Sequence, residues 1–249
     1  MGEGPHHRRA IQEEFNRAAP GFAERTKVRF DDLDVVEFSR VREGESVCEV
    51  GAGTGNFLSL FSGRAGWLLA ADLTPGMLLE AQRRFDDVTA VCSDGFRLPF
   101  KSGSIDLVAT AQTLHHIYEP VPFLKELRRV ARPGGRVLIV DQVVPESLEK
   151  ATVRHELEVL RDPSHAATRP ASAFRIVLRA AGLEIIDERV VDSQSSLSKW
   201  MWPGEFPAER IAEVRDFIER YGDQTGMDWQ RSGDDWSYVR HRMMLLARP

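Results

Sequence analysis

The chain has 249 residues, of which 42% are hydrophobic, and this length and composition suit one main α/β domain with an added lobe. Its 33 basic and 38 acidic side chains give a net charge of −5 without a dense basic run, which argues against a nucleic-acid partner. No stretch approaches the roughly 20 apolar residues of a membrane span, and residues 1–12 lack the apolar core of a signal peptide. We therefore expect a cytoplasmic protein with a small, roughly neutral partner, and we expect it to be a monomer or homodimer.

The expected elements alternate between strands and helices. Ahead of the sheet, helices at 9–18 and 32–40 would belong to an extension, residues 1–43, that folds across the mouth of the pocket. From residue 46 onward, runs rich in Val, Ile and Leu alternate with helical patterns, which is typical of a parallel sheet covered by helices on both faces. The strands are expected at 46–50, 67–72, 88–93, 105–109, 136–141, 184–191 and 238–247, and the helices between them at 75–85, 120–131 and 172–181.

Two insertions interrupt this alternation within the main domain, residues 44–249. The first, at about 145–170, contains a predicted helix at 148–160, and the second, at about 193–235, contains one at 208–221. Both follow strands, on the side where an open α/β sheet binds its ligand, so we expect them to form a lid over the substrate.

The segment 49–55, E-V-G-A-G-T-G, is the most informative in the chain. Its glycines predict a tight turn after a strand, where a ligand can approach the backbone, and a helix that begins near Asn56. A dinucleotide fingerprint would need glycine in place of Asn56, and the Gly-Lys-Ser/Thr ending of a P-loop is absent. Because Glu49 would repel phosphate and attract a cationic group, the turn suits a ligand with an amino-acid part.

Acids follow the next two predicted strands. Asp72 ends the second strand, where one carboxylate can accept two hydrogen bonds from a ribose diol. Asp94 follows the third, where it can accept from an exocyclic amine while Phe96 stacks on an aromatic base. The two cysteines, Cys48 and Cys92, lie in separate apolar runs without C-x-x-C spacing, and we expect both to be buried without a disulfide or metal.

Together these motifs resemble a known family. E-V-G-A-G-T-G, A-A-D-L-T-P-G-M-L ending at Leu78, S-D-G-F-R-L-P-F ending at Phe100, S-I-D-L-V, L-H-H-I and R-P-G-G are similar to class I S-adenosylmethionine-dependent methyltransferases. Within that class they are most similar to the small-molecule branch that includes the ubiquinone and menaquinone methyltransferases. The resemblance implies a Rossmann-like, seven-stranded, mostly parallel sheet with its last strand antiparallel, helices on both faces, an N-terminal helical extension and helical lid insertions.

The resemblance also implies S-adenosyl-L-methionine as cofactor, with S-adenosyl-L-homocysteine as product. The implied cofactor contacts are the methionine-binding Glu49, Gly51, Ala52, Gly53 and Gly55, the ribose-binding Asp72, the adenine-binding Leu73, Met77, Asp94, Gly95 and Phe96, the sulfonium-side Ala111 and Gln112, the lid residues Phe15 and Phe22, and His116 in the pocket wall.

Three histidines are candidate catalytic groups. His115 and His116 form a pair after the fourth strand, where either can serve as a base or shape the pocket, and too few further ligands lie nearby in the sequence for a metal site. His165 lies on a turn of the first insertion and is a candidate base on the substrate side, or else a capping or surface residue. His165 and His116 are thus the predicted catalytic residues.

The predicted reaction is methyl transfer to an oxygen, carbon or nitrogen of a small metabolite. The aromatic residues of the second insertion favour an aromatic or apolar acceptor, or else form the core of the lid: Trp200, Trp202, Phe206, Trp229 and Trp236. Two alternatives keep the bound cofactor, namely a non-methylating reaction such as a rearrangement, and a binding or regulatory protein without turnover. Methylation of nucleic acid or protein is disfavoured, because Ala-Gln-Thr-Leu at 111–114 replaces an Asn-Pro-Pro-Tyr-like sequence.

Overall fold

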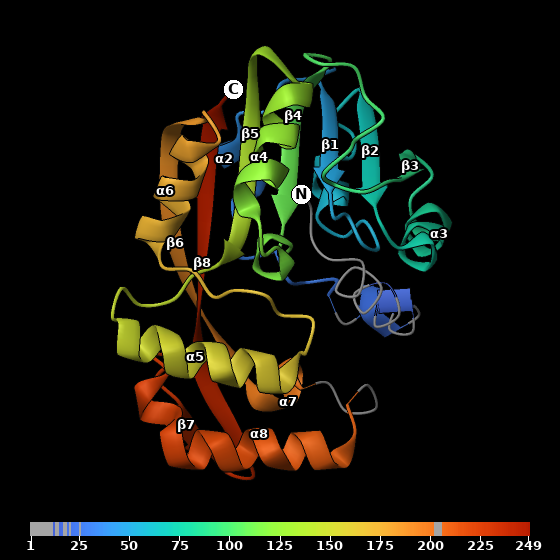
Figure 1. Ribbon diagram of the computed structural model, residues 1–249. Coiled ribbons are helices and arrows are strands. Elements are labelled where there is room, and N and C mark those ends of the chain that lie inside the picture. Colours follow the sequence, from blue (N-terminus) through green and yellow to red (C-terminus); the bar gives the residue numbers. More distant parts are fainter. Residues whose placement is uncertain (1–11, 13–14, 17–18, 20, 25, 202–205) are drawn as a thin grey trace.

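The computed structural model describes residues 12, 15–16, 19, 21–24, 26–201 and 206–249, and it contains one twisted mixed sheet (Figure 1). The strand order is β3-β2-β1-β4-β5-β8-β6, with a short β7 paired to β8. The strands are β1 (Ser46–Val50), β2 (Trp67–Asp72), β3 (Val88–Cys92), β4 (Ile105–Ala111), β5 (Ala131–Gln142), β6 (Glu184–Ser196), β7 (Gln230–Ser232) and β8 (Asp235–Arg248).

The strand directions match the expected Rossmann-like fold. Strands β1 to β5 pair in parallel, and β8 lies antiparallel between β5 and β6. The fold class predicted from the sequence is therefore confirmed, with one addition. The three-residue β7 forms a small hairpin with β8 and brings the sheet to eight strands; it is too short and too exposed to produce an apolar alternation.

The described helices lie close to the positions that the sequence predicts, except for α7, which was not predicted. They are α2 (Val35–Ser39), α3 (Pro75–Arg84), α4 (Pro120–Val130), α5 (Leu148–Arg161), α6 (Ala171–Ala180), α7 (Leu197–Trp200) and α8 (Ala208–Tyr221). Both α3 and α4 begin with proline, whose fixed φ suits the first helical turn. The helix predicted at 9–18 and the side chain of Trp202 lie largely or wholly outside the described residues. None of the described helices combines the length and apolar character of a membrane span.

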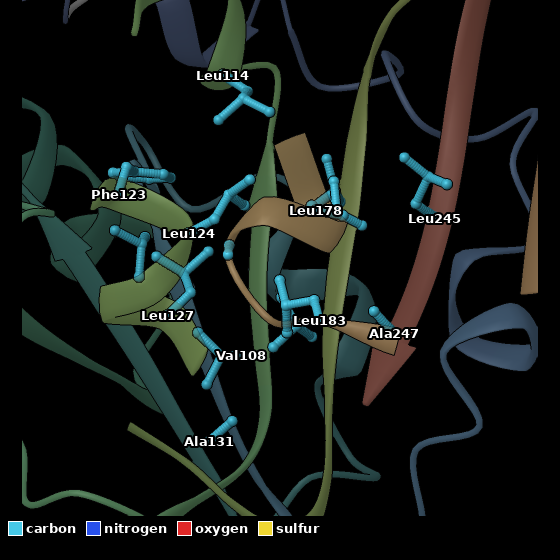
Figure 2. Close-up of a cluster of buried hydrophobic side chains, with 14 of the residues drawn as sticks. Val108, Leu114, Phe123, Leu124, Leu127, Ala131, Leu178, Leu183, Leu245 and Ala247 are labelled. Atoms are coloured by element: carbon cyan, nitrogen blue, oxygen red, sulfur yellow. The ribbon is translucent and has the colours of Figure 1, made fainter. Parts of the chain in front are cut away.

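The sheet is buried on both faces, which explains why its strands read as continuous apolar runs. On one face, Leu127 of α4 and Leu178 of α6 pack with Val108 and Leu245 (Figure 2). The neighbouring residue Leu107 points to the opposite core, as expected from the two-residue period of a strand. The two cores hold β1 and β4 rigidly, and the candidate site lies at the ends of these strands.

Leu127→Ala is expected to lower the free energy of unfolding by about 2–5 kcal/mol, because it removes a fully buried side chain and leaves a cavity. The matched control is Leu79→Ala, since Leu79 is 56% exposed on α3. Urea denaturation followed by circular dichroism measures both. Equal stability of the two variants would contradict the packing described for α4.

The two insertions and the long ends of β6 and β8 form a separate lobe. Strands β6 and β8 stay paired as far as Ser196 and Ser237, so β6 continues well past its predicted end at 191, whereas this pairing of β8 reaches only just before its predicted start at 238. Figure 1 shows α5, α7 and α8 gathered around these ends, beneath the sheet in this view. Leu157 of α5 packs there with Val214 and Ile218 of α8 and with Tyr238. The sequence pattern missed the extension of β6 because polar residues occupy one face of the ribbon.

The turn after β1 differs from the prediction. No regular helix begins near Asn56; the chain instead forms a short 3-10 turn, Leu58–Phe61. The Asn56 amide donates to the carbonyl of Ala23 at 2.8 Å and so ties this segment to the N-terminal region. The chain then turns again at Gly63, where φ is +75°, before β2 begins. Because Asn56 is bound to the N-terminal region and the chain turns at Gly63, the segment between them forms only one short helical turn.

The prediction that both cysteines are buried is correct for Cys48 and wrong for Cys92. Cys48 is fully buried in β1, whereas Cys92 is exposed. Strand β3 is an edge strand, so its last residue is not covered on all sides. An apolar run alone does not distinguish an edge strand from a central one. Both cysteines are free thiols.

Candidate functional site

A cavity of about 150 Å³ lies at the carboxyl ends of β1, β2 and β4 and next to the loop that follows β3. Its walls combine the glycine turn, the strand-end acids and part of the N-terminal segment. The lining contains every predicted cofactor contact except Gly55: Phe15, Phe22, Glu49, Gly51, Ala52, Gly53, Asp72, Leu73, Met77, Asp94, Gly95, Phe96, Ala111, Gln112 and His116. The structure thus gathers residues from five separate segments of the chain around one space.

Each of the three positions in the turn favours glycine for a different structural reason. All have positive φ, which favours glycine. A Cβ atom on Gly51 would clash with the Thr113 side chain, whereas on Gly53 it would meet only a Phe22 ring carbon, at 3.8 Å, within the cavity. On Gly55 it would lie 3.3 Å from Cβ of Ala81 in α3. Gly53 therefore leaves the backbone accessible to a ligand, and Gly55 allows close packing away from the cavity instead of lining it.

Glu49 is an acid in an unusually apolar place. The side chain is buried, and its Oε2 atom has no hydrogen-bond partner among the described residues. Burial, together with the nearby charge of Asp72, raises the pKa of Glu49 well above its usual value. A ligand ammonium group would supply the missing partner and favour the carboxylate. The site therefore fits the amino-acid part of S-adenosylmethionine.

Asp72 connects the end of β2 to the glycine turn. Its Oδ2 accepts a hydrogen bond from the Gly53 amide at 2.8 Å, and its Oδ1 accepts one from the Thr74 amide at 2.7 Å. Burial nevertheless raises the pKa of Asp72. Each carboxylate oxygen has a second lone pair, so the group can still accept from a ribose diol. Asp72 thus has a local structural role besides its predicted one.

A second cavity, of about 360 Å³, lies between the sheet and the lobe. Its described lining residues are Phe15, Phe22, Val28, Arg29, Asp31, Asp32, Gln112, His115, His116, Gln142, Arg154, Arg161, Asp162, Gln194, Ser195, Lys199, Trp200, Phe206, Tyr238 and Arg240. Five of them, namely Phe15, Phe22, Arg29, Gln112 and His116, also line the first cavity. The two cavities therefore share a wall. Of the predicted aromatic contacts, Trp200 and Phe206 line this space, while Trp229 and Trp236 pack in the lobe core.

A buried histidine–carboxylate pair lies at the wall of the second cavity, with His115 lining it and Asp141 behind. His115 Nδ1 is 2.6 Å from Asp141 Oδ1, and the His115 amide donates to Asp141 Oδ2 at 3.1 Å. Burial alone would raise the pKa of Asp141, but the charge and hydrogen bond of His115 outweigh it and lower that pKa. This geometry fixes the imidazole with Nδ1 toward the carboxylate. Because His115 lines the cavity, it is the histidine best placed to exchange a proton with a ligand there.

His116 stands in the shared wall. Its Nδ1 atom is 3.0 Å from the carbonyl oxygen of Ser164, and its ring packs edge-on against Phe15 with centroids 5.4 Å apart. Burial, aided by neighbouring His115, lowers the pKa of His116 to about 4. The ring is therefore neutral at physiological pH and contributes mainly to the shape of the junction.

His165, the other predicted base, lines neither cavity. It is 2% exposed, its Nε2 atom is 3.0 Å from Thr168 Oγ1, and its ring stacks behind His115 at 5.4 Å. Burial lowers the pKa of His165 to about 3. The helix–helix turn that carries it faces inward as predicted, but toward the back of His115. The structure therefore favours His115 over His165 as a proton acceptor.

Sequence reasoning missed Asp141 and the cationic side chains of the second cavity. Asp141 ends the predicted strand 136–141, and His115 follows the strand at 105–109, so the signal was present in both motifs. Their contact depends on β4 and β5 being neighbours, a strand order that local patterns do not contain. Arg154, Arg161 and Arg240 lie in segments whose distance along the chain hides their convergence.

Residues 48–139 match the family model described as a methyltransferase domain. This chain carries a class I methyltransferase domain. The match covers β1 to β5 and both strand-end acids, so the family predicted from the motifs is confirmed. S-adenosylmethionine as cofactor is confirmed with it, at the level of the family.

The methyltransferase domain also has curated relatives. The demethylmenaquinone methyltransferase of Beutenbergia cavernae is 36% identical over 104 residues, which cover 42% of this chain and 43% of the relative. The chain therefore spans less than half the length of that relative. The lobe that lines the second cavity lies outside residues 48–139, the part that matches the methyltransferase family model.

Solved structures share the fold over a larger part of the chain. A putative methyltransferase from Bacillus halodurans has a TM-score of 0.79 at 24% identity and covers 88% of this chain and 98% of its own. The YcgJ protein from Bacillus subtilis has a TM-score of 0.75 at 22% identity and covers 86% and 96%. At these identities the likeness concerns the fold, lobe included.

Proposed function

We propose that this protein transfers the methyl group of S-adenosylmethionine to an oxygen, carbon or nitrogen atom of a small molecule held in the second cavity. The observation that carries the proposal is the wall shared by the two cavities, which includes Gln112 and His116. Methyl transfer is an in-line displacement in which the reacting atoms must approach to about 3–3.5 Å. Two adjacent cavities that share lining residues are the arrangement that such an approach needs.

In this proposal the first cavity holds the cofactor, whose sulfonium supplies an electrophilic methyl group. Glu49 binds the ammonium group, the turn at Gly53 lies against the amino-acid part, and Asp72 accepts from the ribose hydroxyls. The adenine lies between Leu73, Met77 and Phe96. The unpartnered oxygen of Glu49 is the strongest support for this orientation, because a buried carboxyl group without a partner can receive the ligand's ammonium group.

The proton of the acceptor is taken by His115 in this proposal. Asp141 holds the Nδ1 side of the ring and stabilises the positive charge that the imidazole gains. His116 and Gln112 form the wall beside the reacting atoms and help to exclude water. The catalytic role predicted for His165 is not proposed, since that side chain reaches neither cavity.

We also propose that the N-terminal extension, residues 1–43, covers the cofactor, and that the segments 145–170 and 193–235 form the lid over the acceptor. The support for the extension is that Phe15, Phe22 and Phe30 line the first cavity. The support for the lid is that Arg161, Lys199 and Phe206 line the second. Loops with such roles commonly order on ligand binding.

Asp72→Ala is expected to weaken S-adenosylmethionine binding by about one to two decades, at about 1.4 kcal/mol per decade, because it removes the ribose acceptor and frees the Gly53 amide. Titration calorimetry measures the affinity. Asp87→Ala, which removes an exposed acid outside both cavities, is the matched control.

The reaction itself is tested by incubating the wild-type protein with S-adenosylmethionine and candidate acceptors and searching for a mass gain of one methyl group. Formation of S-adenosylhomocysteine with a methylated product supports the proposal. Tight cofactor binding with a rearranged but unmethylated product would identify the non-methylating alternative instead. Binding without any product across the acceptor classes would favour a regulatory protein.

A further inference from the structure

The second cavity has an excess of positive charge in a protein that is acidic as a whole. Its described lining carries five cationic side chains, Arg29, Arg154, Arg161, Lys199 and Arg240, against three acids, Asp31, Asp32 and Asp162. The whole chain has a net charge of −5. When positive side chains from separate segments meet at one cavity of a protein whose net charge is negative, a negatively charged ligand is indicated.

The cations differ in how well the protein neutralises them. Arg154 is fully engaged, since its Nε and Nη2 atoms lie 2.9 and 2.8 Å from Glu158 Oε1. Arg161 has weaker contacts, at 3.4 Å to Glu158 and 3.9 Å to Asp162, and its guanidinium lies over the Trp200 ring. On the α5 side the two arginines are therefore balanced in charge by Glu158 and Asp162, but the long contacts of Arg161 leave its guanidinium open to a further acceptor.

Arg240 and Lys199 have still less compensation. Arg240 lies 3.9 Å from Asp32, which is already paired with the buried Arg242, and its Nε atom has no hydrogen-bond partner among the described residues. Burial and neighbouring Arg242 lower the pKa of Arg240, as expected for a cation without enough counter-charge. Lys199 is exposed at the edge of the cavity and has no ion pair within the described chain.

These groups reach the cavity from different parts of the fold. Arg161, Lys199 and Arg240 belong to α5, α7 and β8 of the lobe, whereas His115 and Gln112 belong to the loop after β4, next to the first cavity. Figure 1 shows α5 and α7 in the lobe, apart from the end of β4. Aromatic side chains, among them Trp200, Phe206 and Tyr238, line the same space.

We propose that the methyl acceptor is an organic anion with an apolar or aromatic body, whose carboxylate or similar acidic group is bound by Arg161, Lys199 and Arg240 on the lobe side of the cavity. The atom to be methylated then lies beside His115 and the first cavity. A volume of about 360 Å³ falls within the usual range of about 300–1,000 Å³ for small-molecule pockets. The inference rests on the proposed function, because it assigns the second cavity to the acceptor.

The test measures binding to the protein loaded with S-adenosylhomocysteine, so that it does not depend on turnover. The probes are matched acid and amide pairs: 2-naphthoate and 2-naphthamide, cinnamate and cinnamamide, and decanoate and decanamide. We expect at least one acid to bind about tenfold more tightly than its amide by titration calorimetry, since charge-assisted hydrogen bonds favour the anion. This preference should weaken as the salt concentration rises.

Lys199→Gln should abolish much of the preference for the acid, and Lys199→Arg should retain it. Lys199 is exposed and unpaired within the described chain, so neither change threatens the fold. The matched control is Lys125→Gln, which removes an exposed lysine of α4 outside both cavities. Equal binding of acids and amides, no binding of any acid, or equal effects of Lys199→Gln and Lys125→Gln would overturn the inference.

The two proposals fail in different ways. If the acids bind more tightly than their amides but none of them gains a methyl group, the anion site stands and the methyltransferase activity is rejected for these acceptors. If neutral molecules are methylated and acids are not bound, the methyltransferase proposal stands and the anionic acceptor is rejected. Mass spectrometry of the same mixtures provides the second readout.

Discussion

Glu49→Gln is expected to weaken S-adenosylmethionine binding by about 10- to 150-fold, which corresponds to the roughly 1.5–3 kcal/mol of a hydrogen bond to a charged group. The physical reason is that Glu49 is buried with an unpartnered Oε2 atom, which only a ligand cation is positioned to neutralise. The amide has the same shape and no charge. Titration calorimetry on both proteins measures the difference, with Glu43→Gln as a control at an exposed acid.

The same substitution should remove a proton linkage. Burial raises the pKa of Glu49, so the ligand-free protein holds a proton on this group at pH values where an ordinary glutamate has lost it. Binding an ammonium ion favours the carboxylate and releases that proton. The affinity of the wild-type protein should therefore rise with pH in this window, and its binding enthalpy should depend on the ionisation enthalpy of the buffer. In Glu49→Gln the buffer dependence should be smaller.

The stability of the ligand-free wild-type protein should fall with rising pH, whereas its affinity for the ligand rises. A carboxyl group with a raised pKa contributes stability that is fully present below its unfolded-state pKa and is lost as the pH rises toward and through its folded-state pKa. Gln at this position stays neutral at every pH. We therefore expect ligand-free Glu49→Gln to be more stable than the wild-type protein at neutral pH by thermal denaturation. A variant with unchanged affinity and unchanged stability would refute the assignment of Glu49 as the ammonium site.

His115→Ala is expected to lower kcat by about 10²- to 10⁴-fold, the usual contribution of general acid–base catalysis, once an acceptor with an ionisable nucleophile is in hand. Cofactor affinity should stay near that of the wild-type protein, because His115 lines the second cavity and not the first. His165→Asn is the matched comparison, since His165 stacks behind His115 without lining either cavity. Equal losses in the two variants would contradict a proton-transfer role for His115.

Asp141 is a positioning residue in this scheme, and its test needs a readout that a merely structural residue would not change. Asp141→Asn keeps the shape but replaces the acceptor facing His115 Nδ1 with a group that can donate. We expect kcat to fall, and we expect the losses of Asp141→Asn and His115→Ala to be non-additive in the double variant, because Asp141 acts through His115. Additive losses in the double variant would reduce Asp141 to a packing role.

The cofactor half of the site was predictable because each of its signals is local. Gly51 and Gly53 predict the tight turn, and Asp72 is the last residue of the apolar run that forms β2. Parallel strands bring their carboxyl ends to one edge of the sheet, so residues that end consecutive strands meet without further information. Local signals failed where the surroundings decide, as at Cys92 on the edge strand and at Asn56, which the N-terminal segment tethers.

The sequence by itself determined the fold class, the family and most residues that line the first cavity, since strand periodicity, turn glycines and strand-end acids act over a few residues. Only the tertiary structure decided the second cavity. It paired His115 with Asp141 through the adjacency of β4 and β5, turned His165 behind His115, and gathered Arg161, Lys199 and Arg240 around one cavity. These groups are far apart in the chain, and their charges acquire a common function only because folding places them around the same volume.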